Sequence, residues 1–96
     1  MGGSGIGEGQ TWQNLTASRT CNTMYINDTG KAISLTVFAT GSGGGIYAVI
    51  GGTSINIASG YSAFTNMTGS IIVPKTSSYI ISCAQLSYIT YWYELR

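Results

Sequence analysis

Residues 87–96 read Ser-Tyr-Ile-Thr-Tyr-Trp-Tyr-Glu-Leu-Arg, and this stretch decides the fold. Every residue from Tyr88 to Tyr93 is β-branched or aromatic, which favours a pleated strand. Successive side chains of a strand point to opposite faces, so both faces here carry large side chains that need cover. Such a strand is expected between two layers or at a contact between chains. One face carries Tyr88, Thr90, Trp92 and Glu94, and the other carries Ile89, Tyr91, Tyr93 and Leu95.

Residues 32–38 form a second strand pattern with clear alternation. Ile33, Leu35 and Val37 share one face, and Phe38 lies on the other face with smaller polar residues. The preceding Asn-Asp-Thr-Gly-Lys at 27–31 is typical of a turn, because Asn and Asp cap turns and glycine tolerates positive φ. The pattern predicts a hairpin between residues 22–26 and 32–38.

Further strand patterns follow along the chain. The dipeptide Gly51-Gly52 separates strands at 46–50 and 53–57, which predicts a tight hairpin with a type I′ or II′ turn. A strand at 70–73 ends at Pro74, and another begins at Ser78. About eight strands recur roughly every 8–12 residues, and no segment has a helical period. The sequence therefore predicts an all-β fold, an antiparallel, jelly-roll-like β-sandwich.

Length and charge limit the possible partners. The 96 residues predict one domain at 9–96, preceded by a tag or linker at 1–8. Only 7% of residues are charged and the net charge is +1, without a basic patch, which argues against nucleic acid as a partner. No apolar run is long enough to insert into a membrane. A surface with so little charge is weakly protected from self-association, which favours an oligomer.

Cys21 and Cys83 are the only cysteines, and the chain has no histidine. A bond between them would close a long loop and stabilise the fold by about 4 kcal/mol in the chain-entropy model. Since assembly in a reducing cytoplasm keeps thiols reduced, we expect two separate, half-buried thiols. Two cysteines without histidine do not make a metal site.

The residues that carry catalytic chemistry are few. The acids Glu8, Asp28 and Glu94 lie in a linker, a turn and a terminal strand, so a paired-carboxylate glycosidase site is not expected. Serine and cysteine nucleophiles lack a histidine base. The sequence indicates a protein that is not an enzyme and uses no cofactor or metal. Its many Tyr and Trp rings suit packing, interfaces or stacking on sugars.

Ordered motifs at both ends of the chain resemble a known family. They are Gly-Gln-Thr-Trp-Gln-Asn-Leu-Thr-Ala-Ser-Arg at 9–19, Tyr25 with Asn-Asp-Thr-Gly-Lys-Ala-Ile at 27–33, Ile-Val-Pro at 72–74 and Trp-Tyr-Glu-Leu-Arg at 92–96. Together they resemble the C-terminal domain of tail fibres of tailed bacteriophages and prophages. The chain departs from that pattern at Lys31-Ala32, where the family tends to have Arg-Pro, and in its cysteines. Residues 40–70 are unmatched.

The resemblance implies a homotrimeric β-sandwich at the distal tip of a fibre in the virion, assembled in the cytoplasm of the bacterial host. Such a tip binds a receptor on the bacterial surface, either a polysaccharide or an outer-membrane protein. The alternative is a trimerisation or folding domain of the fibre with no ligand of its own. A pattern shared by fibres of different hosts suits scaffold, so recognition is expected on the unmatched loops at 40–45, 51–52 and 59–69.

This interpretation assigns roles to individual residues. In the last strand, Ile89, Tyr91, Tyr93 and Leu95 are expected in the core, with Glu94 and Arg96 at the rim of a contact between subunits. Arg19 and Glu94 either form an ion pair between the two terminal motifs or remain separately solvated. The ligand-binding residues are expected to be Ser42, Tyr47, Tyr61, Phe64 and Asn66, and the trimer-interface residues Trp12, Tyr88 and Trp92.

Overall fold

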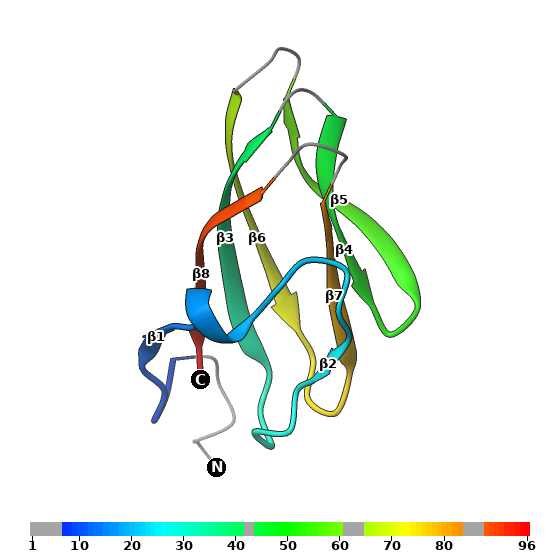
Figure 1. The fold of residues 1–96 in the computed structure, drawn as a ribbon. Helices are drawn as coiled ribbons and strands as arrows, with labels where there is room; N and C mark the ends of the chain where they lie inside the picture. Colours follow the sequence, from blue (N-terminus) through cyan, green and yellow to red (C-terminus); the bar gives the residue numbers. More distant parts are fainter. Residues whose placement is uncertain (1–6, 42–43, 61–64, 84–87) are drawn as a thin grey trace.

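The protein is a sandwich of two antiparallel sheets, each with four strands (Figure 1). The computed structural model describes residues 7–41, 44–60, 65–83 and 88–96. The two four-stranded sheets confirm the predicted all-β sandwich. A short 3₁₀-helix, η1 (Thr16–Ser18), follows the first strand. The first sheet has the order β1 (Trp12–Asn14), β8 (Tyr88–Leu95), β3 (Ile33–Gly41) and β6 (Thr65–Val73). The second has the order β2 (Tyr25–Ile26), β7 (Ser78–Cys83), β4 (Gly44–Ile50) and β5 (Thr53–Gly60).

The strand order is that of a jelly roll. The first strand pairs with the eighth, the second with the seventh, the third with the sixth and the fourth with the fifth. This nested pairing is one long hairpin rolled into two sheets, and the rolling adds the β3–β8 and β4–β7 pairs. The predicted hairpin at Gly51-Gly52 is the tip of that long hairpin. Both glycines have positive φ, 57° and 91°, as a type I′ turn requires.

The core lies between the sheets and follows the predicted alternation. Ile33, Leu35 and Val37 are fully buried on β3 and face Tyr79 and Ile81 of β7. Full burial of an aliphatic side chain of this size stabilises the fold by roughly 1.5–3 kcal/mol. The buried hydrophobic cluster consists of Ile33, Leu35, Val37, Ala39, Ile46, Ala48, Met67, Val73, Tyr79, Ile81 and Trp92.

Strand β8 contains a bulge that reverses its two faces. Phe38 is opposite Tyr91 and Ala39 is opposite Ile89, so Thr90 has no partner on β3. A single extra residue shifts every following side chain to the other face. Ile89 therefore packs against the core, as do Trp92 and Glu94, both with 0% exposure.

Three expectations for β8 are consequently wrong. Tyr91 is 47% exposed and Tyr93 points outward beside Thr36, so neither lies in the core. Trp92 is fully buried within one chain and cannot contact another subunit. Glu94 is not at a rim. The period of two alone could not place these side chains, because the bulge interrupts it.

The turn at 27–32 connects the two sheets and does not form the predicted hairpin. β2 pairs with β7 in the second sheet, whereas β3 pairs with β6 and β8 in the first. The fully buried side chain of Asn27 holds this crossing in place. Its Nδ2 lies 2.7 Å from the carbonyl oxygen of Lys31, 3.1 Å from that of Val73 and 3.2 Å from that of Pro74.

We expect Asn27→Ala to lower the free energy of unfolding by about 2–3 kcal/mol, because it removes the donor that serves these carbonyls. The control is Asn14→Ala, since Asn14 is exposed and only accepts, from the amide and hydroxyl of Thr16. That change should remain below about 1 kcal/mol. Urea denaturation measures both, and equal losses would contradict a structural role of the Asn27 amide.

The two cysteines form a disulfide, so the expectation of separate thiols is wrong. Cys21, in the segment between η1 and β2, is bonded to Cys83 at the end of β7. The prediction relied on the compartment of assembly and not on geometry, whereas the fold brings the two Cα atoms to 5.8 Å. The bond attaches the η1 segment to the second sheet at the β1–β2 side of the sandwich.

The β5–β6 side is closed by close packing at a glycine. A Cβ atom added to Gly69 of β6 would lie 2.8 Å from Cγ1 and 2.9 Å from the carbonyl oxygen of Ile57 on β5. Only glycine therefore lets the edges of the two sheets approach this closely.

No helix within residues 7–41, 44–60, 65–83 or 88–96 has the length and apolar character needed to cross a bilayer.

Candidate functional site

A buried carboxylate connects the two terminal motifs. One oxygen of Glu94, Oε2, accepts hydrogen bonds from Arg19 Nε at 3.1 Å, Tyr79 OH at 2.9 Å and Trp92 Nε1 at 2.9 Å. Arg19 and Glu94 therefore form the ion pair that was one of two predicted outcomes. Because Tyr79 belongs to the second sheet and Glu94 to the first, the cluster holds the sheets together.

Arg96 completes this cluster on its outer side. Its Nη1 lies 3.2 Å from Glu94 Oε1, an ion pair whose geometry is not that of a hydrogen bond, and its Nη2 lies 3.2 Å from Asp28. The fold thus brings two of the three acids to one arginine. Glu94 is nevertheless fully enclosed, so this carboxylate is not accessible to a substrate.

Burial and charge together set the protonation states in the cluster. Burial, followed by the nearby Glu94 carboxylate, raises the pKa of Tyr79 to about 12. Burial opposes the charge of Arg19, but Glu94 outweighs it and raises the pKa of Arg19 above its ordinary value. The Arg19 guanidinium also lies 4.7 Å from the centre of the Tyr25 ring, a cation–π contact.

The Tyr79 shift predicts a loss of stability in strong alkali. The folded protein holds the Tyr79 proton more tightly than the unfolded chain, whose tyrosines titrate near pH 10. The contribution of this proton to the free energy of unfolding is fully present below pH 10. It should fall by roughly 2–3 kcal/mol as the pH rises to 12. Urea denaturation at pH 9 and pH 11.5 tests it, with Tyr79→Phe as the control. Equal pH dependence of both proteins would contradict the assignment.

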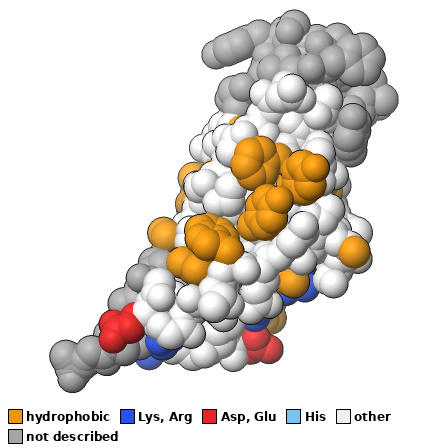
Figure 2. Space-filling model, turned by 90° about the vertical axis from the view of Figure 1, so that its left-hand side faces the viewer, with side chains coloured by type: hydrophobic (Ala, Val, Ile, Leu, Met, Phe, Trp, Pro, Cys, Tyr) orange, Lys and Arg blue, Asp and Glu red, His pale blue; other side chains and the backbone are white. Residues whose placement is uncertain are grey.

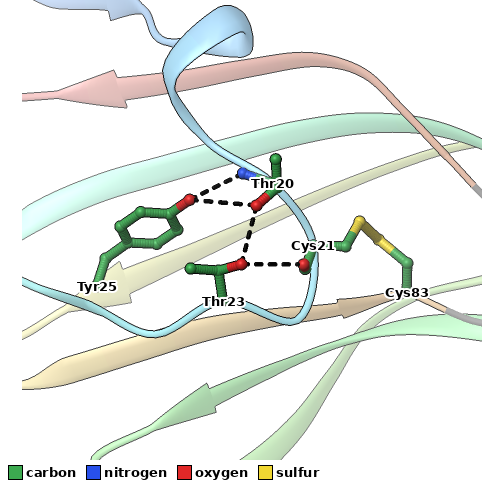
Figure 3. Close-up of a disulfide and its surroundings, with 5 residues drawn as sticks. All are labelled: Thr20, Cys21, Thr23, Tyr25 and Cys83. Carbon is green, nitrogen blue, oxygen red and sulfur yellow. Dashed lines mark hydrogen bonds between the residues drawn. A yellow bond between two sulfur atoms is a disulfide. The ribbon is translucent and has the colours of Figure 1, made fainter.

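The segment between η1 and β2 is fixed by the disulfide and by hydrogen bonds (Figure 3). The Thr20 amide donates to the Tyr25 hydroxyl at 2.9 Å, and the hydroxyls of Thr20 and Thr23 are 2.9 Å apart. Burial opposes ionisation of Tyr25, but the Thr20 hydrogen bonds and Arg19 outweigh it and lower the Tyr25 pKa. The segment is thereby attached to Cys83, the last described residue before 84–87.

Six strand ends meet at one end of the sandwich, which we call the loop end (Figure 1). Gly41 is opposite Thr65, Gly44 is opposite Gly60, and Cys83 and Tyr88 pair with the neighbouring residues of β4 and β3. The connections 42–43, 61–64 and 84–87 therefore begin and end there. β1 lies at the other end, where Trp12 pairs with Leu95.

Two of the five sequence-predicted ligand residues are described, and they lie apart. Ser42, Tyr61 and Phe64 lie outside the described residues. Asn66 is exposed on the outer face of the first sheet near the loop end, where it accepts a hydrogen bond from Thr40 at 3.0 Å. Tyr47 is 43% exposed on the outer face of the second sheet. Asn66 and Tyr47 thus face opposite sides.

The predicted interface residues also have different positions. Trp12 is 56% exposed on β1, as a residue available to a partner must be. Trp92 is buried, and the side chain of Tyr88 is not among those that the structure describes.

A group of exposed and half-buried aromatic rings lies on the outer face of the first sheet. We call Trp12, Phe38, Tyr91 and Tyr93 the aromatic platform. Tyr91 and Tyr93 stack with ring centres 5.9 Å apart, and Phe38 stands at right angles to both, 6.2 Å and 6.0 Å away. Figure 2 shows hydrophobic side chains gathered on this face. Exposed apolar groups of this kind often mark binding surfaces.

Two shallow hollows flank Phe38. One, of about 360 Å³, is lined by Trp12, Thr36, Phe38 and Tyr93. The other, of about 280 Å³, contains Phe38 and Tyr91 together with polar residues near the loop end. Its lining is Phe38, Ala39, Thr40, Asn66, Met67, Thr68, Thr90 and Tyr91.

Comparison with known proteins yields no match. No protein-family model, curated protein or solved structure matches this chain. Among the described residues, no group of three or more His, Cys, Asp or Glu side chains could hold a metal ion.

Sequence reasoning missed the aromatic platform as a unit. It placed Tyr91 and Tyr93 in the core and gave Phe38 no role. One signal was present, because Phe38 lies on the polar face of an otherwise alternating strand. An aromatic residue at an outward position usually has a neighbour to pack against, and here the neighbours are the rings of β8.

Proposed function

We propose that this chain is the distal receptor-binding domain of a phage tail fibre. It binds a polysaccharide or an outer-membrane protein on the bacterial surface through the connections at its loop end. It acts in the virion as a homotrimer and is not an enzyme.

The observation that carries the proposal is the grouping of six strand ends at the end opposite β1. A chain that enters the domain through β1 at one end presents three connections at the other. The longest extent of the described protein is 47 Å, and the strand ends that flank these connections lie at the end away from β1. Binding residues commonly lie on loops held by a rigid scaffold.

The positions of the motif residues also support the proposal. Arg19, Trp92 and Glu94 belong to the motifs that carry the resemblance to tail-fibre domains. Arg19 and Trp92 both donate hydrogen bonds to Glu94 inside the sandwich. Motifs that build a scaffold leave the connections free to vary with the host receptor. The disulfide suits a protein that works outside the reducing cytoplasm.

Association of copies, which the proposed homotrimer requires, is favoured by exposed apolar side chains beside an edge strand. Met24 is 60% exposed and Ile26 of β2 is 53% exposed, at an edge of the second sheet. Edge strands readily pair with another chain unless they are protected. Light scattering at micromolar concentration should give about three times the chain mass of 10.1 kDa, and a monomer would contradict the trimer.

A cell-binding experiment tests recognition at the loop end. Labelled protein is applied to a panel of bacterial strains, and bound label is measured for the wild type and for a variant with Tyr61, Phe64 and Asn66 changed to alanine. The expected result is binding to some strains and a loss of at least tenfold in the variant. Lys75→Ala is the control, because Lys75 is exposed in the β6–β7 turn at the opposite end.

The alternative, a trimerisation domain without a ligand, predicts a different outcome. In that case no strain binds the protein, or the loop variant binds as well as the wild type, while the trimer remains intact. Either result would exclude recognition by these loops.

A further inference from the structure

We infer that the aromatic platform binds a neutral oligosaccharide, at a site separate from the connections of the loop end. The two hollows on either side of Phe38 would each accept one sugar ring. The inference does not depend on the assignment to a tail fibre.

Three of the four rings of the platform hold one another in place before any ligand binds. Phe38 is wedged at right angles against both Tyr91 and Tyr93, and these two rings stack on each other. The rings of β8 and β3 stand on two central strands, each of which is paired with a neighbouring strand on both sides. Aromatic side chains also have few rotatable bonds, so they lose little conformational entropy when a ligand binds. Such rings offer fixed apolar surface to the C–H face of a pyranose.

The shape of the surface suits a chain of linked rings. Phe38 lines both hollows, so a ligand long enough to fill both would pass over the Phe38 ring. The hollows, about 360 Å³ and 280 Å³, lie near the lower end of the size range of small-molecule sites. A ligand of at least two connected rings therefore uses the surface better than a single sugar.

The polar groups around the rings are neutral. Thr36 pairs with Ser70 at 3.0 Å and Thr40 with Asn66 at 3.0 Å, so hydroxyls and amides of neighbouring strands lie beside the rings. Among the described residues that line the two hollows, none is charged. An apolar surface with a few oriented hydroxyls and amides matches sugar, which has apolar faces and a hydroxylated edge.

Other occupants fit this surface less well. An anionic membrane surface is attracted by lysine and arginine, and none lines the hollows. A second copy of the chain would have to insert an exposed apolar side chain into each hollow, and light scattering of the platform variants detects that contact. The exposed apolar residues Met24 and Ile26 lie instead on the second sheet and its approach.

A glycan array followed by NMR tests the inference. An array of neutral and acidic oligosaccharides selects ligands, and the strongest neutral ligand is titrated into ¹⁵N-labelled protein. The chain has two indole groups, one exposed in Trp12 and one buried in Trp92. We expect the Trp12 indole signal to shift with the sugar concentration and the Trp92 signal to remain in place.

Variants then identify the surface. Trp12→Ala and Tyr91→Ala should each weaken binding of that sugar at least tenfold, since both side chains are about half exposed and their loss leaves the core intact. Ile72→Ala is the matched control, because Ile72 of β6 is 48% exposed and lines neither hollow, and it should change binding less than twofold. Thermal melting verifies that each variant is folded.

The outcomes separate this inference from the proposed function. The inference fails if no neutral oligosaccharide binds, or if Trp12→Ala and Tyr91→Ala leave binding unchanged. It also fails if these variants dissociate the oligomer in light scattering, which would make the platform a contact between copies. A Tyr61→Ala, Phe64→Ala double variant separates the two surfaces, because it leaves Asn66 of the second hollow unchanged. If the platform variants lose the sugar while only this double variant loses the bacteria, the two surfaces bind different ligands.

Discussion

Replacing Glu94 with alanine should lower the free energy of unfolding by about 3–5 kcal/mol, the usual effect of removing one partner from a buried ion pair. The Tyr79 hydroxyl and the Trp92 indole N–H would lose their common acceptor in the core. Arg19, which is largely buried, would lose the charge that balances it. Removal of one carboxylate thus leaves three polar groups without their partner. The loss in free energy of unfolding should therefore exceed that caused by truncating an apolar core side chain of similar size.

Urea denaturation followed by tryptophan fluorescence measures this effect, since Trp92 reports on the same cluster. Asp28→Asn is the matched control. Asp28 also forms an ion pair with Arg96, but its side chain is 82% exposed, so the control should change stability by less than about 1 kcal/mol. If Glu94→Ala and Asp28→Asn have similar effects, the buried cluster does not hold the sheets together.

Reduction of the Cys21–Cys83 bond should lower the free energy of unfolding by about 4 kcal/mol in the chain-entropy model. The bond joins residues 62 positions apart, and the reduced unfolded chain regains the freedom that this closed loop removes. Cys21 is also the covalent attachment of the η1 segment to the second sheet. The β1–β2 side of the sandwich should therefore loosen before the β5–β6 side.

The measurement is urea denaturation with and without a phosphine reductant. A Cys21→Ser, Cys83→Ser double variant should match the reduced wild type and be insensitive to the reductant. A thiol assay on the air-oxidised, denatured protein should find no free thiol. Two reactive thiols in that assay, or a midpoint that reductant does not change, would contradict the bond.

Local pattern was a good guide where side chains alternate without interruption. Ile33, Leu35 and Val37 are buried as predicted, and Gly51-Gly52 forms the expected turn, because both features depend on neighbouring residues. The hairpin predicted across residues 27–31 is wrong for a different reason. The turn is real, but Asn27 binds carbonyls of the Val73-Pro74 segment, far away in sequence, and so directs the chain into the other sheet.

Strand β8 marks the limit of reading one strand at a time. Its sequence alone does not disclose that Thr90 lacks a partner, since the bulge is defined by the pairing of Phe38 and Ala39 on β3. The buried Glu94 follows from the same arrangement. An acid is suited to that core position only because Arg19, Tyr79 and Trp92 come from three parts of the fold to meet it. The ion pair could be named from sequence, but its burial could not.

The nested order of strand pairs has a consequence for how the protein is made. A ribosome releases the strands in sequence, and β4 and β5 can pair as soon as both have emerged, because two residues separate them. Each outer pair then waits for a later partner, and β1 waits longest, since Trp12 must meet Leu95. Glu94 and Trp92 emerge with the same late strand. The nascent chain thus carries unpaired edges until β8 is synthesised, and long-range pairing of this kind is slow and exposed to misassociation.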